Sequence, residues 1–415
     1  MRYLTEDLEG AGGRIKVHPA DFRVTEIPLY EPSGTGDHVY LYVEKEGIGS
    51  LEAAERIARA FGRPRHLVGL AGLKDAQAVT RQWMSLERVD PDKAAALHLP
   101  NIKILNVSRH RHRLKIGHLA GNRFEVRLRG CPPHARKLTA AVLEVLQRRG
   151  VPNWFDRQRF GTRGDNHLLG RALVLGQARE FCDRFLGRPS EAADSPRLAG
   201  ARRAYDAGNL EEAKKGFTGL ADQLRVLMTL ARTRDLERAM RALPKQLARL
   251  LVGAYQSDLF NAVLDRRLDE IDRVETGDLA YIHPRVPRSA RGGPCSPPSG
   301  PAGAVFRVER PEDEAPRAAR FEISPTGPIV GHRVTLASAR PGEIERAMLA
   351  EKGVSPADFE RVKALRLRGD RRPLRVPLID VEVDPVGDDI VVRFTLPSGA
   401  YATVALAEIM KSDSR

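Results

Sequence analysis

One carboxylate in this chain stands out, because it breaks an apolar run at a place where the backbone can turn. The run starts at Gly69 and stays apolar through Leu73, and Lys74 and Asp75 then end it before a polar segment rich in Thr, Arg and Gln. Glycines at 69 and 72 allow a sharp turn, so the pattern predicts a buried strand followed by a turn that presents Asp75. A carboxylate with a reference pKa of about 3.9 is ionised at neutral pH and can serve as a nucleophile without a helper base. The residue types alone favour a plainer role for Asp75, as a turn or cap residue.

A second set of residues suits contact with a nucleic acid. Between Asn153 and Gly161, aromatic side chains alternate with Arg157 and Arg159, a mixture suited to base stacking and phosphate contact together. The same aromatics could lock a hinge between domains, and the two roles are compatible. For the basic stretch 109–115, phosphate contact and a solvated strand edge are equally supported.

Other charged residues do not indicate a bound metal or cofactor. His110, His112 and His118 have no cysteine or carboxylate at ligand spacing, so we reject a metal site there. The acidic residues of 380–384 alternate along a predicted strand, where a solvated face is favoured over a divalent-ion site. The sequence has neither a phosphate-binding Gly-Lys-Ser/Thr loop nor a dinucleotide fingerprint. We therefore expect chemistry without a cofactor.

The first part of the chain alternates in a way typical of strands, with two helices. Ser50 is predicted to cap a helix that turns Leu51, Ala54, Ile57, Ala58 and Phe61 inward and ends at Gly62. A second helix is predicted over Ala135–Arg149, with Gly150 as its stop. Strands are predicted at 14–17, 22–27, 38–44, 102–107 and 122–128.

The pattern changes after Gly161. Residues 166–268 are predicted to be mostly helical, with amphipathic segments at 224–230 and 244–268. Six prolines and four glycines between 283 and 304 predict a mobile surface loop. Beyond it we expect strands at 304–308, 331–336, 374–383 and 390–396, and helices at 343–351, 356–365 and 404–410.

Composition points to a large protein with a polyanionic partner. At 415 residues the chain exceeds the length of about 250–300 at which single cores divide, so two domains are expected. Lys and Arg outnumber Asp and Glu by 68 to 54, a net charge of +14, which favours nucleic acid before a membrane surface. No apolar run or signal pattern indicates a membrane, and three scattered cysteines suggest no disulfide framework. We expect a cytoplasmic, reduced protein with no membrane association.

The turn at Asp75 and five further elements resemble the TruD family of tRNA pseudouridine synthases. They occur in family order, from residue 16 to residue 403. The matching elements are Lys16 with 19–26, Gly72–Asp75 with Ala78, Thr80 and Gln82, Gly121–Phe124, Gly150–Gly161, Leu259–Asn261, and Leu396–Thr403.

Three positions depart from the family pattern. Trp154 stands where Tyr is usual and Tyr401 where Phe is usual, so both keep an aromatic face. Asp156 stands where Gly is usual, and it introduces a negative charge that the family lacks there.

The resemblance implies an α+β fold of two domains. A pseudouridine-synthase-like mixed β-sheet forms the catalytic domain from both chain ends, residues 1–160 and 372–415. Residues 161–371 form an inserted α/β TRUD domain. The composition shift after Gly161 agrees with this division but does not itself show that the two ends pair.

The resemblance also assigns roles to particular residues. Asp75 would be the catalytic nucleophile. Phe124 and Tyr401 would flank the flipped uracil with Tyr30 nearby, and Asn122 would hold the base or position Asp75. Without the family, Phe124 would be interpreted as a core residue of a strand, and Tyr30 as a loop aromatic. Lys16, Lys74, Arg157 and Arg159 are the candidates for RNA contact.

Two classes of function follow. The first is a synthase, expected to be a monomer, that converts uridine 13 in the D arm of tRNA, or a uridine of another RNA, to pseudouridine. The second is a non-catalytic RNA-binding protein on the same scaffold. The intact Lys74–Asp75 turn favours the enzyme, because a protein that only binds RNA has no need of it.

Overall fold

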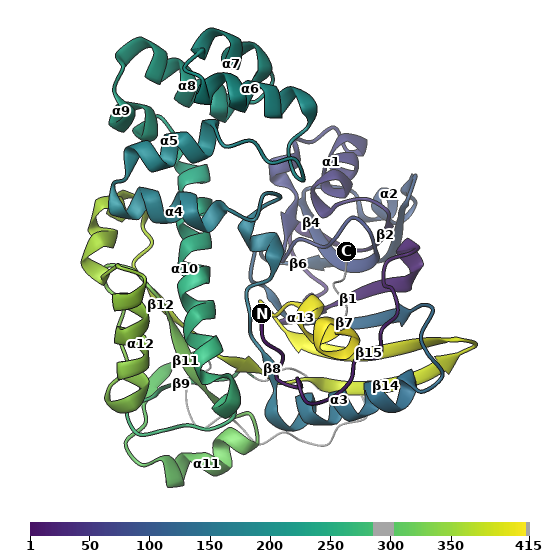
Figure 1. Ribbon diagram of the computed structural model, residues 1–415. Coiled ribbons are helices and arrows are strands. Elements are labelled where there is room, and N and C mark those ends of the chain that lie inside the picture. The colour runs from purple at the N-terminus through teal and green to yellow at the C-terminus, as the bar shows by residue number, and fades with distance from the viewer. Residues whose placement is uncertain (285–302, 412–415) are drawn as a thin grey trace.

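The two ends of the chain build one large mixed sheet (Figure 1). The structure, a computed structural model, describes residues 1–284 and 303–411. Within these residues nine strands join in the order β14-β15-β7-β1-β4-β2-β6-β5, with β3 paired to β4. The strands are β1 (Phe22–Pro28), β2 (His38–Glu46), β3 (Gly69–Leu70), β4 (Val79–Glu87), β5 (His98–Leu99), β6 (Ile102–His110), β7 (Leu119–Leu128), β14 (Ile379–Val386) and β15 (Asp389–Pro397).

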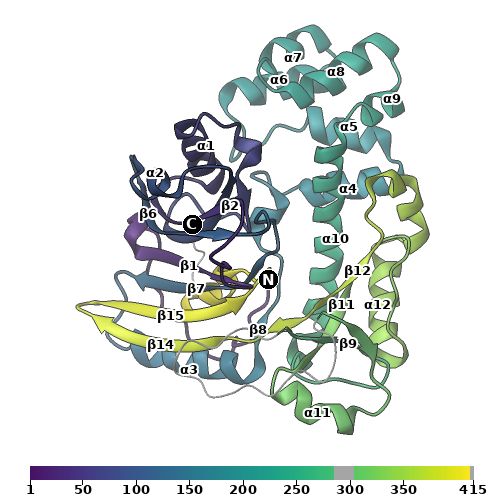
Figure 2. The same ribbon diagram turned by 180° about the vertical axis from the view of Figure 1, so that it is seen from behind.

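One pairing in this sheet is parallel. β1 runs parallel to β4 with Arg23 opposite Val79, and antiparallel to β7 with Val24 opposite Phe124. The C-terminal β15 pairs with β7, and Figure 2 shows β15 and β14 at that end of the sheet. The sheet expected from both chain ends is therefore present.

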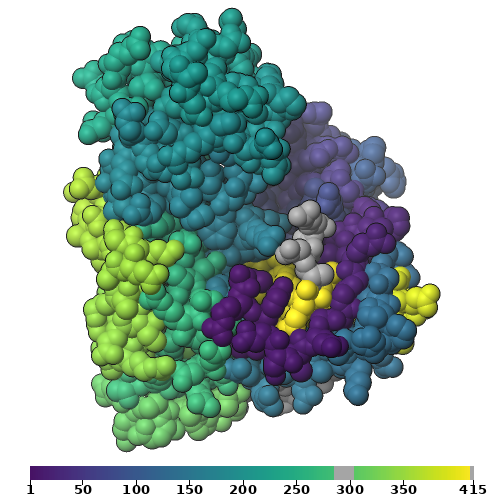
Figure 3. All heavy atoms as spheres, viewed as in Figure 1, coloured from purple at the N-terminus to yellow at the C-terminus, as the bar shows by residue number. Residues whose placement is uncertain are grey.

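Two groups of helices cover the sheet. α1 (Ser50–Ala60) and α2 (Pro91–Ala95) pack over β2, β4 and β6 through a cluster that includes Ile57, Leu41 and Met84. α3 (Ala135–Arg149) and α13 (Ala402–Met410) pack over β1, β7 and β15 through a second cluster, with Phe394 at 0% exposure. The N-terminal segment lies against the C-terminal residues (Figure 3), because the buried Glu408 of α13 accepts hydrogen bonds from the amides of Leu4 and Thr5.

The middle of the chain builds a helical region around the long helix α10 (Lys245–Arg267). α10 packs on α4 and α12 and on the small antiparallel sheet β10-β9-β11-β12 (Figures 1 and 2). The elements are α4 (Asn166–Leu175), α5 (Ala178–Leu186), α6 (Pro196–Asp206), α7 (Leu210–Gly216), α8 (Ala221–Thr233), α9 (Leu236–Arg241), β9 (Leu279–Ile282), β10 (Val305–Arg307), α11 (Pro311–Ala319), β11 (Ile323–Ile329), α12 (Ala339–Glu351), η5 (Pro356–Leu365) and β12 (Asp370–Pro373).

The middle region leaves and rejoins the sheet region at adjacent points. The short strands β8 (Val151–Pro152) and β13 (Arg375–Val376) pair with each other, so the two connections run side by side. The exact domain boundaries given above stay a prediction. No helix in the described parts of the chain has the length and apolarity needed to cross a membrane.

Several predicted elements match the structure, and others need correction. The helix over Ala135–Arg149 is confirmed with the same bounds, and the helix starting at Ser50 is confirmed before Gly62. Residues 331–336 form no strand. The strand is instead β11 at 323–329. It was not predicted because Pro325 and Pro328 lack the backbone N–H that donates to a neighbouring strand, so the segment does not have a typical strand pattern.

Four smaller differences have local causes. Near residues 14–17 there is only one isolated bridge, between Arg14 and Arg129. The cap of α1 is Gly49, because the Ser50 hydroxyl turns inward, and Leu51 is consequently 46% exposed. Residues 356–365 form 3-10 helix, and 374–383 divides into β13 and β14. Most of the predicted loop at 283–304 lies outside the described residues.

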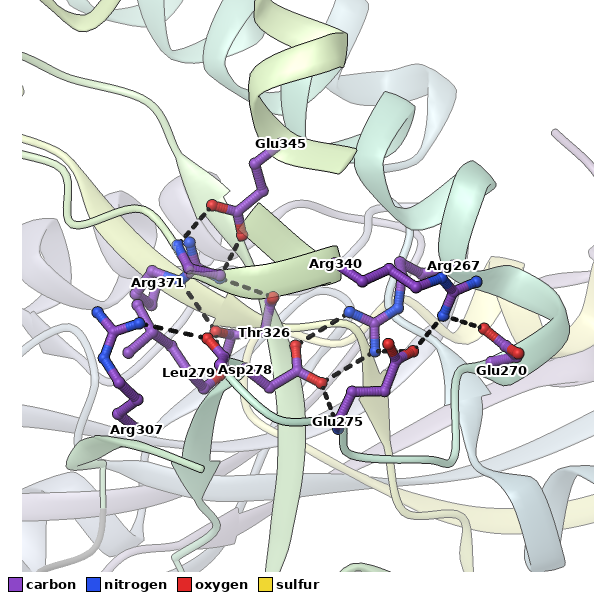
Figure 4. A network of polar contacts seen from close by, with 12 residues as sticks. Arg267, Glu270, Glu275, Asp278, Leu279, Arg307, Thr326, Arg340, Glu345 and Arg371 are labelled. Carbon is purple, nitrogen blue, oxygen red and sulfur yellow. Dashed lines mark hydrogen bonds and ion pairs between the residues drawn. The ribbon is translucent and has the colours of Figure 1, made fainter. Parts of the chain in front are cut away.

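Buried ion pairs tie the end of α10 to the small sheet (Figure 4). Arg267 donates to both carboxylate oxygens of Asp278 at 3.0 Å, and both side chains are almost fully buried. Arg371 of β12 bonds Glu345 of α12 at 2.7 Å and Thr326 of β11. These contacts join the end of α10 to the residue before β9, and join β12 to α12 and β11.

Because Arg267 is buried, removing Asp278 leaves its charge with the more distant Glu275, whose Oε1 lies 3.5 Å away. We expect Asp278→Ala to lower the free energy of unfolding by about 3–5 kcal/mol. Glu270→Ala removes an exposed partner of Arg340 in the same network, and its loss should stay below about 1 kcal/mol. Chemical unfolding of both variants measures the difference, and equal losses would contradict a special role for the buried pair.

Candidate functional site

Asp75 lies in the loop between β3 and β4, with 36% of its side chain exposed. Oδ2 accepts a hydrogen bond from Lys16 Nζ, and Oδ1 accepts one from the amide of Gln77 at 3.3 Å. Burial raises the pKa of Asp75, but the Lys16 ammonium and the amides of Gln77 and Ala76 together lower it more. The pKa therefore lies below its usual range, so the carboxylate is ionised at neutral pH and open to a ligand.

A buried lysine holds the backbone of Asp75. Lys45, at the end of β2, is 1% exposed, and its Nζ donates to the carbonyl oxygens of Asp75 at 2.8 Å and of Ile48 at 2.6 Å. Burial lowers the pKa of Lys45 to about 8, and the negative charge of Asp75 opposes that shift. The ammonium is thus still charged at neutral pH, where it fixes the loop and adds a positive charge near the carboxylate.

The residues before Asp75 are held from α1 and β4. Ser50 Oγ accepts from the amide of Lys74 at 2.8 Å and donates to Gln82 Oε1 at 2.6 Å. Gln82 Nε2 donates to the carbonyl of Gly72 at 3.3 Å. The loop is therefore preorganised by side chains that are themselves buried.

Lys74 also supports the loop from inside. Its Nζ lies 2.8 Å from Glu26 Oε2, and the two side chains are only 4% and 1% exposed. Glu26 Oε1 accepts from the amide of Trp83 at 3.2 Å. The expectation that Lys74 contacts RNA does not agree with this placement, because its ammonium is enclosed and neutralised by Glu26.

Beside Asp75 lies an aromatic row on the helix-covered face of the sheet. Lys16 Nζ lies 4.7 Å from the ring centre of Phe22, which packs edge-on to Phe124 at 6.2 Å, and Phe124 contacts Phe394 at 5.4 Å. Phe124 is 7% exposed, so it belongs largely to the core. Oδ1 of the neighbouring Asn122 is buried and has no hydrogen-bond partner within residues 1–284 and 303–411, which leaves an acceptor for a ligand.

Two predicted site residues, Arg159 and Tyr401, meet Phe155 at the junction of the two regions, where Arg372, which was not predicted, joins them. The Arg372 guanidinium lies 4.2 Å from the ring centre of Phe155, and Arg159 lies 5.8 Å from the same ring. Tyr401 packs edge-on to Phe155 at 6.4 Å. Burial lowers the pKa of Arg372 to about 10, so this guanidinium is still cationic at neutral pH.

Phe155, Arg159 and Arg372 line a cavity of about 480 Å³ to which both regions contribute. The sheet region contributes Leu119 and Ser398, and the helical region contributes Gln256 and Tyr281. Leu119 connects the cavity to the Asp75 loop, because its side chain lies under 4 Å from where a Cβ at Gly72 would be. The cavity is therefore next to the loop that carries the carboxylate.

The structure explains the unusual Asp156. Its carboxylate caps the short helix η3 (Arg157–Phe160) by accepting from the amide of Arg157 at 2.7 Å, and it accepts from Thr403 Oγ1 at 2.8 Å. The extra charge thus ties the 157–160 turn to the start of α13. Arg159 in this turn donates Nε to Ser257 of α10 at 3.1 Å.

Tyr30 packs in a cluster that includes Ala71 of the Asp75 loop and Leu119 of the cavity. Its ring stacks on His110 at 5.0 Å, and its hydroxyl bonds His118 Nδ1 at 2.6 Å. It belongs to a cluster with Tyr40 and Trp83, which fits the interpretation as a packed loop aromatic. In the basic stretch 109–115, Arg109 and Arg113 donate to backbone carbonyls, so part of its charge has a structural role.

Sequence reasoning missed Lys45 and Ser50. Val39, Leu41 and Val43 are fully buried, so the period of two predicts that Lys45 also points inward. A charged residue at an inward position of an apolar strand was therefore a usable signal. No such signal existed for Ser50, because a serine at a helix start is ordinarily a cap.

Three comparisons with known proteins bear on this arrangement. The family model described as tRNA pseudouridine synthase D (TruD) matches residues 1–409. The protein named tRNA pseudouridine synthase D of Geobacter metallireducens is 45% identical over 99% of this chain and 98% of its own length. The protein of that name from Anaeromyxobacter dehalogenans is 37% identical over the whole chain and 97% of its own length. A crystal structure assigned as TruD of Methanosarcina mazei is 27% identical with a TM-score of 0.82, covering 100% of this chain and 97% of that one.

The Lys16 ammonium stabilises the ionised form of Asp75, so its removal should raise the pKa of that carboxyl. We expect Lys16→Met to shift the acidic limb of the kcat–pH profile upward, because turnover needs the carboxylate and the protonated fraction then grows at higher pH. Lys16→Arg keeps the charge and is the control. An acidic limb at the same pH in both variants would show that Lys16 does not tune Asp75.

Proposed function

The chain belongs to the TruD family of tRNA pseudouridine synthases, and on that basis we propose that it isomerises uridine to pseudouridine in tRNA with Asp75 as nucleophile. The observation that carries this proposal is the state of Asp75. Its carboxylate is ionised and partly exposed, while its loop is held by Lys45, Ser50 and Gln82. The position of the target, uridine 13 in the D arm, follows from the family resemblance.

The reaction makes few demands on the protein. The C1′–N1 bond of the nucleotide breaks, the base turns, C5 bonds to C1′, and a proton leaves C5. An ionised carboxylate serves the first step either by attacking C1′ or by assisting a glycal-like intermediate. The uridine must first leave its stack to reach Asp75. The free Asn122 acceptor belongs to a residue paired with Glu26, the partner of Lys74, so we expect it to hydrogen-bond the base. Phe22 and Phe124, 4% and 7% exposed, support this site from the core.

The supports of the loop argue against a protein that only binds RNA. Burying the Lys45 ammonium costs free energy. In return, the hydrogen bond from this ammonium to the Asp75 carbonyl holds the loop in place. Such placement benefits a reacting group, for which small displacements reduce rate, more than it benefits a phosphate contact. A synthase acting on another RNA is the second candidate, because the same site chemistry serves any flipped uridine.

We expect the tRNA to lie between the sheet region and the helical region. The cavity there is lined by Arg159 and Arg372, and it adjoins the Asp75 loop through Leu119. The chain carries a net charge of +14, and a basic cleft concentrates a polyanion. Asp75 would then lie at the floor of the cleft.

Asp75→Asn tests the nucleophile directly. The amide keeps the shape but cannot form the covalent bond or stabilise positive charge, so we expect product formation to be abolished. Affinity for tRNA should stay within about three-fold, because phosphate contacts dominate binding. The measurements are pseudouridine content by mass mapping and filter binding. Activity within about ten-fold of the wild type would remove Asp75 from the nucleophile role.

Arg159→Glu tests the position of the RNA. We expect weaker tRNA binding. The slope of log binding constant against log salt concentration should become shallower by about one, the change that loss of one phosphate contact produces. Arg320→Glu is the matched control, since this arginine is 61% exposed beside Glu322 next to α11, away from the cavity. Equal effects from the two reversals would indicate non-specific attraction and contradict the cleft.

A further inference from the structure

Large apolar side chains are exposed around the Asp75 loop. Leu73 is 62% exposed and Ile116 is 72% exposed, the two highest fractions among the large hydrophobic residues of the described chain. Leu29 is 55% exposed and lines the cavity at the junction. An apolar side chain in water forgoes the stabilisation of burial, so a group of them beside a reactive carboxylate calls for an explanation.

Backbone contacts bring these residues together although they are far apart in sequence. The amide of Gly117 donates to the carbonyl of Ala71 at 2.8 Å, which places the turn 115–118 against the loop 71–75. The amide of Leu29 donates to the carbonyl of His118 at 3.5 Å. Leu73 and Ile116 therefore project from neighbouring segments of one surface, with Leu29 beside them.

Both segments are firmly held, so the exposed side chains have fixed positions. The loop at Leu73 is tied to Ser50 and Gln82 through its neighbours Lys74 and Gly72. The turn at Ile116 is closed by the amide of His118 on the carbonyl of Lys115 at 3.0 Å. Apolar side chains on a rigid support lose little conformational entropy when they are inserted between other groups.

The proposed reaction creates a need for such groups. A uridine that leaves its stack exposes the faces of the neighbouring bases, and proteins that open a stack insert leucine, isoleucine or similar side chains into the gap. We propose that Leu73 and Ile116 form an apolar wedge that enters the base stack of the substrate RNA beside the target uridine and holds the gap open. This role rests on the proposed function and extends it.

The surroundings favour RNA over a protein partner. Lys115 adjoins Ile116 and Lys16 bonds Asp75, so cations that match phosphates accompany the apolar groups. A protein docked on Leu73 would also cover Asp75, which is two residues away, and would block the reaction.

The test measures unstacking separately from turnover. In an Asp75→Asn background, a 2-aminopurine next to the target uridine of the tRNA should brighten on binding as the base leaves the stack. We expect Leu73→Ala with Ile116→Ala to remove most of that increase, while affinity measured by anisotropy stays within about three-fold. With Asp75 intact, the same pair should lower kcat about ten-fold with little change in KM.

Matched variants separate the wedge from general effects. Met228→Ala removes another exposed side chain, 53% exposed on α8, and should leave both signals unchanged. Ile116→Met keeps an apolar side chain and should retain most of the unstacking. A full fluorescence increase in the double alanine variant would overturn the wedge. A change in the oligomeric state of that variant without loss of unstacking would also overturn it, and would show that the two side chains contact another protein chain. Failure of the wild type to form pseudouridine would instead overturn the proposed function.

Discussion

The parallel pairing of β1 with β4 is the constraint on which the site depends. Parallel strands begin at the same edge of a sheet, so the segments that precede them are brought together. Lys16 precedes β1 and the Asp75 loop precedes β4, and Arg23 lies opposite Val79 in the register. The ion pair between Lys16 and Asp75 across 59 residues of sequence follows from this one pairing. An antiparallel arrangement would place the two segments at opposite edges.

Buried charges from the neighbouring strands also support this loop. Glu26 lies one residue beyond Thr25, the last residue of β1 paired with β4, and it contacts both the amide of Trp83 and the Lys74 ammonium. Lys45 comes from the neighbouring β2 and reaches the Asp75 carbonyl. Buried charges are tolerated where partners and hydrogen bonds compensate for lost hydration. Here that compensation is used to hold the backbone on both sides of a reactive carboxylate.

Local patterns in the sequence predicted the elements better than the contacts between them. The turn at Asp75, the helix at Ala135–Arg149 and the alternating strands could be predicted because periodicity and turn residues act over a few positions. Asp75 gained its role from the family resemblance, since the residue alone favours a turn. The enclosure of Lys74 and the packing of Tyr30 depend on strand pairings over long sequence separations, which periodicity does not show. Pro325 and Pro328 concealed β11 because a strand between two partners seldom contains proline.

A few backbone and side-chain hydrogen bonds also hold the junction between the two regions. The Asn261 side chain of α10 accepts from the amide of Phe155 at 2.9 Å and donates to its carbonyl at 3.0 Å, as a neighbouring strand would. This amide pair, together with the pairing of β8 and β13, leaves the ring of Phe155 in a fixed position between the two regions. Arg372 and Arg159 then contact that ring and line the cavity. The aromatic residues of the 153–161 segment therefore help to lock the two regions together, and this lock holds Arg159 and Arg372 at the cavity between them.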